Sequence, residues 1–147
     1  MFLLCLIKNT AEAQAQLDQL PEPWRSALKR VLDHPPAAPV DRTITHGERL
    51  PIAGGLVVIG TPGHTPGHIS LYHQPSRTLI AADALTVEDG RLLGPSAGQT
   101  HDMPLALRSL LALSEYDIDS VVCYHGGLYR DTNSRIRERI AEIARGG

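Results

Sequence analysis

The sequence contains little that would tie the protein to a disulfide framework or to a membrane. Its 147 residues include only two cysteines, Cys5 and Cys123, and neither belongs to a C-x-x-C pair. Isolated thiols are typical of a reducing compartment, so we expect a cytoplasmic protein. The apolar opening at residues 1–7 has no basic residues ahead of it and is too short for a signal sequence or a membrane span. We expect a strand or a buried edge there.

Charged and aromatic residues are not arranged as nucleic-acid binding requires. The chain has 14 basic and 16 acidic residues, a net charge of -2 and 4% aromatic residues, with no basic run and no aromatic ladder. This argues against nucleic acid as a partner and favours a small molecule. A G-x-S-x-G elbow and the glycine-rich loops of nucleotide-binding proteins are also absent, which argues against those classes of protein.

What is present has the composition of an ordinary globular domain, with 42% apolar and 20% charged residues. We expect two parts, residues 1–39 and 40–147. In the first part, the Ala/Gln-rich segment Thr10–Leu20 suits a short helix, and an amphipathic helix precedes a proline-rich connector at 35–39. The apolar face of the second helix is spaced at i, i+4, i+7 and i+8, and consists of Trp24, Leu28, Val31 and Leu32.

From Val40 onward the pattern changes to short strands. Apolar or alternating runs bounded by turn residues predict strands at Asp41–Ile44, Leu56–Ile59, Ile69–Tyr72, Thr78–Ala81 and Val121–Cys123. Asp89-Gly90 marks the tip of a hairpin within Leu85–Leu93. Helical faces follow Asp102 and Asp131, and consist of Met103, Leu107, Leu110 and Leu111, and of Ile136, Ile140, Ile143 and Ala144. This order predicts an antiparallel sheet followed by α-β-α.

The most specific stretch is the octet from Thr61 to His68, which reads T-P-G-H-T-P-G-H and connects two predicted strands. Glycines allow a tight turn and prolines restrict the backbone, so such a loop can hold an imidazole at low entropic cost. That is how a metal ligand is mounted on a loop. The octet is followed by Ala82-Asp83-Ala84 and then by V-V-C-Y-H-G-G at 121–127.

In this order the three motifs resemble the second half of the metallo-β-lactamase superfamily, over residues 43–147. The resemblance implies an α+β fold that is half of an αββα sandwich, with a mostly antiparallel sheet and flanking helices. It implies metal ligands at His64, Asp83 and His125, with His68 and Tyr124 beside them. Asp83 would bridge two ions, of which His64 would complete one and His125 the other.

Three features depart from the family pattern. Ala82 and Tyr124 stand where the family usually has glycine. The upstream H-x-H-x-D-H motif, which supplies the remaining ligands, is absent, and the histidines before the octet are His34 and His46. The chain therefore resembles one truncated domain that has lost, or never included, its N-terminal half.

The ligand types suit zinc, and also iron or manganese, but too few of them are present to require that the site holds metal. A bound ion would supply hydroxide for attack on an ester, thioester, amide or lactone carbonyl. Beyond the ligands, the sequence identifies no catalytic residue. Structural roles also stay open, because Asp83 suits a strand-end turn and an exposed histidine at 64 or 125 needs no ligand role.

Three interpretations remain. The first is a hydrolase whose metal site is completed by a homodimer or by a partner chain. The second is a non-catalytic fragment that serves as a binding or structural module. The third is a mononuclear enzyme that uses His64, Asp83 and His125 alone. The sequence favours the second interpretation over the third, because nothing replaces the missing ligands. A sheet face that has lost its cover is an association surface, so we expect self-association or a partner polypeptide.

Overall fold

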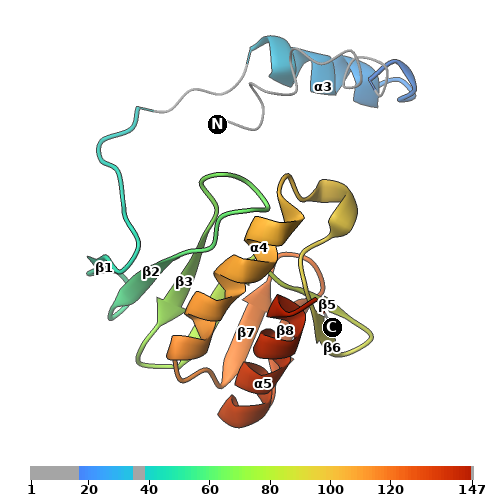
Figure 1. Cartoon of the computed structure of the whole chain (residues 1–147). Coiled ribbons are helices and arrows are strands. Elements are labelled where there is room, and N and C mark those ends of the chain that lie inside the picture. The colour runs from blue at the N-terminus through green and yellow to red at the C-terminus, as the bar shows by residue number, and fades with distance from the viewer. Residues whose placement is uncertain (1–16, 35–38, 147) are drawn as a thin grey trace. The chain divides into compact units, whose positions relative to one another are not determined.

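The computed structural model describes residues 17–34 and 39–146. The chain divides into two compact units, residues 1–43 and 44–147 (Figure 1). The strand expected at 1–7 lies outside the described residues, as do most of the helix expected at Thr10–Leu20 and most of the proline-rich connector. The expectation of a single truncated domain therefore stays a prediction.

In the first unit, helix α3 spans Trp24–Asp33, where the spacing of apolar residues predicts a helix. Three residues of its apolar face, Trp24, Leu28 and Val31, are between 41% and 70% exposed. The side chain of Leu32, the fourth predicted member, lies outside the described part. The apolar face is thus largely open to solvent.

The second unit is built on a six-stranded sheet with the order β1-β2-β3-β4-β7-β8. Neighbouring strands are antiparallel except β4 and β7, which are parallel. A hairpin of β5 and β6 forms a separate two-stranded sheet. The strands span Arg49–Leu50 (β1), Leu56–Gly60 (β2), Ile69–His73 (β3), Thr78–Ala82 (β4), Thr86–Glu88 (β5), Arg91–Leu93 (β6), Ser120–Cys123 (β7) and Gly127–Arg130 (β8).

Two rows of apolar residues cross the six-stranded sheet, one on each face, because residues paired directly across strands point to the same side. The core-face row consists of Val57, Tyr72, Leu79, Val121 and Tyr129. The open-face row lies one position away on every strand and consists of Val58, Leu71, Ile80, Val122 and Leu128. Exposure along the open-face row rises from 0% at Val58 to 53% at Leu128.

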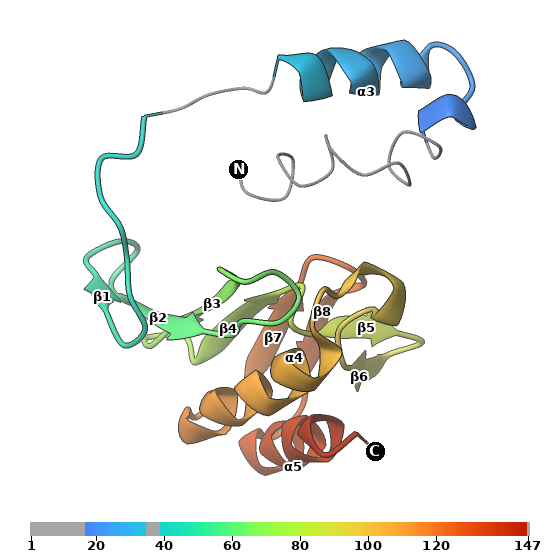
Figure 2. The same cartoon turned by 45° about the horizontal axis from the view of Figure 1, so that its top comes forward.

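The helices of the second unit cover the core face. Helix α4 spans Met103–Ser109 and continues into the 3₁₀ helix η2 at Leu110–Glu115, while α5 spans Asn133–Ala144 and the short 3₁₀ helix η1 spans Ala97–Gln99. Figures 1 and 2 show α4 and α5 on the same face of the sheet. The core between helices and sheet contains Ile59, Leu79, Leu85, Leu110, Leu113, Ile118, Val121, Ile136 and Ile140, among others.

Local sequence explains where α4 begins. The Asp102 carboxylate accepts a hydrogen bond from the backbone N–H of Leu105 at 2.9 Å, and Pro104 lies in the first turn. An aspartate cap followed by proline is a common helix start. The aspartate accepts from an N–H that has no partner within the helix, and proline has no N–H to satisfy.

Several predicted elements agree with the structure, but one predicted strand does not form, strands β1 and β8 were not predicted, and one residue of a predicted helical face is exposed. The strands at β2, β3, β4 and β7, the β5–β6 hairpin and both C-terminal helices are confirmed. The strand expected at Asp41–Ile44 is wrong, because that segment has no strand pairing and β1 lies further on. Strand β8 was not expected, since Gly126 precedes it, Gly127 begins it and only Tyr129 faces the core. Leu111 is 51% exposed because the turn tightens from α to 3₁₀ at Leu110 and turns Leu113 inward instead.

The second unit is therefore an α+β arrangement with a mostly antiparallel sheet and helices on one face. In the described part of the chain, no helix combines the length and apolar character that crossing a membrane requires.

Candidate metal site

The octet forms the loop between β2 and β3, and its position is fixed by the start of α4. Gly63 has a φ of +133°, and a Cβ there would collide with the backbone of Ala106. The N–H of Asp102 donates to the Gly63 carbonyl at 2.9 Å, and the N–H of His101 donates to the His64 carbonyl at 3.2 Å. Only glycine permits this approach, so the loop is held against α4 and His64 has a defined place.

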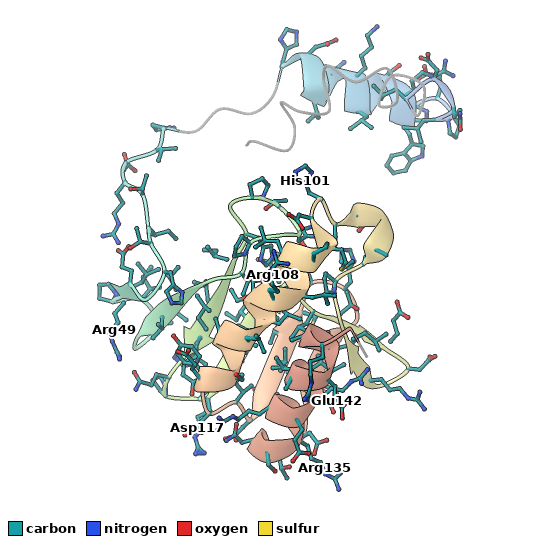
Figure 3. The ribbon with its side chains drawn as sticks, in the orientation of Figure 1. Arg49, His101, Arg108, Asp117, Arg135 and Glu142 are labelled. Atoms are coloured by element: carbon teal, nitrogen blue, oxygen red, sulfur yellow. The ribbon has the colours of Figure 1, made fainter. Side chains whose placement is uncertain are left out.

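Asp83 and His125 follow the ends of β4 and β7, which are parallel neighbours. Parallel strands end at the same edge of a sheet, so the two residues lie side by side. The His125 carbonyl accepts from the N–H of Val87 at 3.1 Å, and a Cβ at Gly126 would collide with the Val87 carbonyl. The β5 strand thus fixes the backbone that carries His125. Figure 3 places His101 near the site loop and Asp117 at the opposite end of the unit.

The three predicted ligands converge. The Nε2 atom of His64 lies 3.8 Å from Oδ2 of Asp83, and Nε2 of His125 lies 3.4 Å from Oδ1 of the same carboxylate. This confirms that residues 61 positions apart, His64 and His125, meet at one end of the sheet. Each carboxylate oxygen faces one imidazole, so Asp83 stands between the two histidines.

Hydrogen bonds indicate that positive charge belongs between these groups. Thr100 Oγ1 donates to the Ser96 carbonyl at 2.7 Å, so its contact with His64 Nδ1 at 3.4 Å assigns the hydrogen to Nδ1. His64 Nε2 then turns a lone pair toward the Asp83 carboxylate. Oδ1 of Asp83 is buried and has no hydrogen-bond partner among the described residues. Oδ1 faces His125 Nε2 at 3.4 Å, whereas Oδ2 faces His64 Nε2. A buried carboxylate oxygen without a hydrogen-bond partner is unfavourable unless a proton or a cation lies beside it.

The donor set fits a metal in kind but not in number. Imidazole nitrogens and a carboxylate are ligands of zinc, iron and manganese, and two ligands of one zinc ion lie about 3.4 Å apart in tetrahedral geometry. The separations of 3.4 Å and 3.8 Å are of that order. Within the described ranges, however, no group of three or more His, Cys, Asp or Glu side chains is arranged to hold an ion. The described residues thus provide two pairs of potential ligands, His64 with Asp83 and His125 with Asp83, rather than one complete site.

His68 lies beside the site. Its hydrogen bonds are those of a neutral imidazole, with one nitrogen that accepts. Its Nε2 accepts from the backbone N–H of Asp83 at 3.3 Å, while Nδ1 contacts Thr61 Oγ1 at 2.8 Å. Burial is the main cause that lowers the pKa of His68, and the nearby His64 lowers it further. The ring lies edge-on to that of His64, with centroids 5.7 Å apart.

The remaining candidates take structural or exposed positions. The side chain of Tyr124 is 68% exposed, and its backbone N–H donates to the Ala82 carbonyl at 3.1 Å. Cys123 is a buried free thiol whose pKa is raised to about 12, chiefly by burial and also by the charge of Asp83. His46 is exposed and accepts from the N–H of Gly60, whereas His73 bridges Ser76 and the Ala53 carbonyl.

Sequence reasoning missed the residues that hold the ligands in place. Thr61 and Ser70 are buried hydroxyls behind the site, and Thr100 orients His64. A pocket of about 240 Å³ also opens beside His125, and it is lined by Thr86, Val87, Glu88, Ser96, Gln99 and His125. Thr61 begins the octet that the sequence singles out, whereas the only signal for Ser70 is a polar residue between the apolar residues Ile69 and Leu71 of β3.

Comparison with known proteins identifies the class. The sequence pattern of the family described as the Metallo-beta-lactamase superfamily matches residues 6–125. The chain therefore belongs to the metallo-β-lactamase superfamily, and its sheet with flanking helices is half of that fold. The motifs alone place the start of the resemblance at residue 43. The family match begins earlier, at residue 6.

Several relatives are much longer than this chain. Hydroxyacylglutathione hydrolase of Rhizobium meliloti (strain 1021) is 39% identical over 118 residues, which cover 71% of this chain and 43% of the relative. "Probable metallo-hydrolase YflN" of Bacillus subtilis (strain 168) is 33% identical over 68% of this chain and 44% of its own length. A solved metallo-beta-lactamase family protein from Thermus thermophilus is 30% identical with a TM-score of 0.60, over 99% of this chain and 43% of that one. The chain thus spans less than half of these relatives.

Proposed function

We propose that this chain carries half of the metal site of a zinc-dependent hydrolase, and that a second polypeptide completes it. The observation that carries the proposal is the Asp83 carboxylate, whose two oxygens face one imidazole each while Oδ1 has no hydrogen-bond partner among the described residues. His64 and Asp83 would hold one ion, and His125 and Asp83 the other. A bound zinc ion lowers the pKa of its water toward about 7 and so provides hydroxide at neutral pH.

The chain's own residues would orient the ligands and receive the substrate. The contact of Thr100 with Nδ1 of His64 supports a ring in which Nδ1 carries the hydrogen, and Nε2 would then be the coordinating atom. The pocket beside His125 is the place for a small substrate, since it opens next to the ligand pair. We favour acyl thioesters over the other carbonyl substrates because several relatives are named hydroxyacylglutathione hydrolase.

The open-face row supports the choice of partner. This row crosses five paired strands, and two of them, β4 and β7, end just before Asp83 and His125. A sheet packed on it would therefore reach the incomplete site. More than half the length of each relative lies outside the part that this chain matches. We infer that the occupant is a polypeptide equivalent to that part, with about 1,600 Å² buried in total. A second copy of this chain is the alternative occupant.

A non-catalytic role has one observation in its favour. No described cluster of three or more potential ligands could hold an ion, so the isolated chain binds metal weakly or not at all under this alternative. The chain would then serve as a binding or structural module of the same fold. In either case we place it in the cytoplasm, because Cys123 is a free thiol.

Zinc binding tests the ligand assignment directly. We expect zinc titrated into the purified chain to bind at least about tenfold more weakly in Asp83→Asn than in the unaltered chain, because loss of a ligand lowers affinity more than loss of an outer partner. Asp119→Asn is the matched control, since that carboxylate pairs with Arg77 at the far end of β4. Equal zinc affinity in the unaltered chain and Asp83→Asn would overturn the assignment.

Reconstitution tests the partner. The segment of the Rhizobium meliloti relative that this chain does not match is mixed with the full chain, and complex mass, zinc content and hydrolysis of a hydroxyacylglutathione thioester are measured. We expect a one-to-one complex that retains zinc and hydrolyses the thioester. A homodimer that excludes the added segment would make the second copy the occupant. A chain that stays monomeric throughout would refute association through the open face.

A further inference from the structure

The backbone that carries Asp83 is held in an unusual conformation. Ala82, the last residue of β4, has a φ of +53°, and the pairing of β4 with β7 shifts register between Ile80 and Ala82. Residues with a Cβ rarely adopt positive φ, so the surrounding structure must hold this turn. Because Asp83 follows at once, the same turn sets the direction of its carboxylate.

Three backbone groups around the turn have partners outside β4. The Ala81 carbonyl accepts from the Ser70 hydroxyl at 3.3 Å, and the Ala82 carbonyl accepts from the N–H of Tyr124 at 3.1 Å. The N–H of Asp83 donates to His68 Nε2 at 3.3 Å. Two of these three partners are side chains from β3 and from the loop before it, so the turn depends on residues outside its own strand.

Those side chains are also bonded to each other through Thr61. His68 Nδ1 lies 2.8 Å from Thr61 Oγ1, which lies 3.0 Å from Ser70 Oγ. Thr61 is 1% exposed and Ser70 is 0% exposed, so water does not compete for these bonds. Two buried hydroxyls and one imidazole thus connect the Asp83 N–H to the Ala81 carbonyl.

The two ends of this connection fix the direction of every bond in it. His68 Nε2 accepts from Asp83, so the hydrogen of the neutral ring is on Nδ1 and is donated to Thr61. Ser70 donates to Ala81, so it must accept from the Thr61 hydroxyl. All donors therefore point the same way, from Asp83 through His68, Thr61 and Ser70 to Ala81. His68 Nδ1 also lies 3.1 Å from the Thr61 carbonyl, and the Ala81 carbonyl also accepts from the N–H of Ala84 at 3.1 Å. Removal of the Thr61 hydroxyl or of Ser70 therefore weakens the connection by one hydrogen bond and leaves these second partners in place.

We propose that His68, Thr61 and Ser70 form a positioning relay, here called the Asp83 relay, which fixes the turn at Ala82 and thereby aims the Asp83 carboxylate between His64 and His125. None of the three would touch metal or substrate. They act through Asp83, and their effect on hydrolysis rests on the proposed function. The relay itself can be tested without metal.

Two matched pairs of variants separate the relay from general packing. Thr61→Val keeps the size of the side chain and removes the hydroxyl, whereas Thr61→Ser keeps the hydroxyl. His68→Asn keeps a donor near the position of Nδ1 but does not reach Asp83, whereas His68→Gln carries an acceptor to the position of Nε2. Ser70→Ala removes the last donor and provides a further variant if one of the others fails to fold.

Amide hydrogen exchange, followed by NMR on the full chain, is the first measurement. We expect Thr61→Val and His68→Asn to speed exchange of the Asp83 amide about fivefold to tenfold, as loss of one hydrogen bond implies. The Leu79 amide in the same strand would change less than about twofold. Thr61→Ser and His68→Gln would restore slow exchange at Asp83. Equal acceleration at both amides, or no rescue by His68→Gln, would overturn the relay.

The second measurement is the affinity of the chain for zinc, with no substrate or partner present. We expect His68→Asn to weaken binding about tenfold, as is usual for a partner that orients a ligand, and His68→Gln to recover most of it. If the unaltered chain binds no zinc, the metal proposal fails while the exchange result still decides the relay. If zinc affinity is the same in His68→Asn as in the unaltered chain, the relay does not aim Asp83.

Discussion

The core face and the open face of the six-stranded sheet carry equally apolar rows but receive different cover. Leu79 and Ile80 are successive residues of β4; Leu79 is fully buried beneath the helices, whereas Ile80 is only half-buried on the other side. The open-face row is only partly covered, since Val58 is fully buried, Leu71, Ile80 and Val122 are half-buried and Leu128 is 53% exposed. A partly exposed apolar row across five strands is typical of a contact surface. From this comparison we expect a contact on the open face that the second unit does not itself supply.

The largest expected effect separates the two faces by stability. Leu79→Ala should lower the free energy of unfolding by about 2–5 kcal/mol, because it leaves a cavity in the core. Ile80→Ala, its neighbour on the open face, should lower it by roughly 1 kcal/mol, because less surface is removed from water there. Urea denaturation of both variants measures the difference. Equal losses would mean that the open face is covered in the isolated protein.

A second effect concerns the thiol at the end of the core face. Burial raises the pKa of Cys123 to about 12, so at pH 8 only about one thiol in ten thousand would be ionised. The thiolate is the reactive form, so alkylation of Cys123 should be very slow at pH 8 and should rise about tenfold for each pH unit until the protein unfolds. The rate is measured by mass spectrometry in a Cys5→Ser background, with urea-unfolded protein as the reactive control. Rapid alkylation of folded protein would contradict burial of this residue.

An intermediate effect concerns association. Val122→Asp places a charge in the open-face row and should weaken any self-association or partner complex at least about tenfold, because a charge without a partner is costly in an apolar contact. The mass in solution across a concentration series is the measurement. Arg137→Asp, at an exposed position of α5, is the control and should leave association unchanged. If Val122→Asp associates as before, another surface is responsible.

The smallest effect concerns the turn before Asp83. Ala82→Gly should raise the free energy of unfolding by about 0.5 kcal/mol, since glycine adopts positive φ without the penalty that alanine meets. Ala81→Gly, one position earlier in an extended strand, should lower it by about 0.5–1 kcal/mol or more. Thermal unfolding of the pair gives both signs. A loss of stability in Ala82→Gly would show that the methyl group packs favourably enough to offset the strain.

Local patterns predicted most of the second unit, and tertiary contacts explain what they missed. Alternating residues indicated β3, and Asp89-Gly90 indicated the hairpin tip. The turn residues around His64 likewise indicated the site loop. Strand β8 escaped prediction because edge pairing with β7, rather than an apolar pattern of its own, holds Gly127–Arg130 extended. The strand expected at Asp41–Ile44 failed for the converse reason, because it has the pattern of a strand but no neighbour.

The candidate site divides in the same way. Motif order predicted that His64, Asp83 and His125 converge, and the measured distances agree. The Asp83 relay was beyond sequence reasoning, because Thr61 and Ser70 meet only after β2 and β3 have paired. The metal role of the three residues stays a prediction.

The parallel pairing of β4 with β7 bears on the order in which the protein folds. Strands β2, β3 and β4 are joined by short connections and can pair locally, whereas β7 must wait for the hairpin, α4 and η2 to be synthesised and placed. Contacts between residues far apart in sequence form slowly, because the chain entropy of the intervening segment is lost before the contact stabilises anything. We therefore expect His64 and Asp83 to come together earlier in folding than His125 joins them.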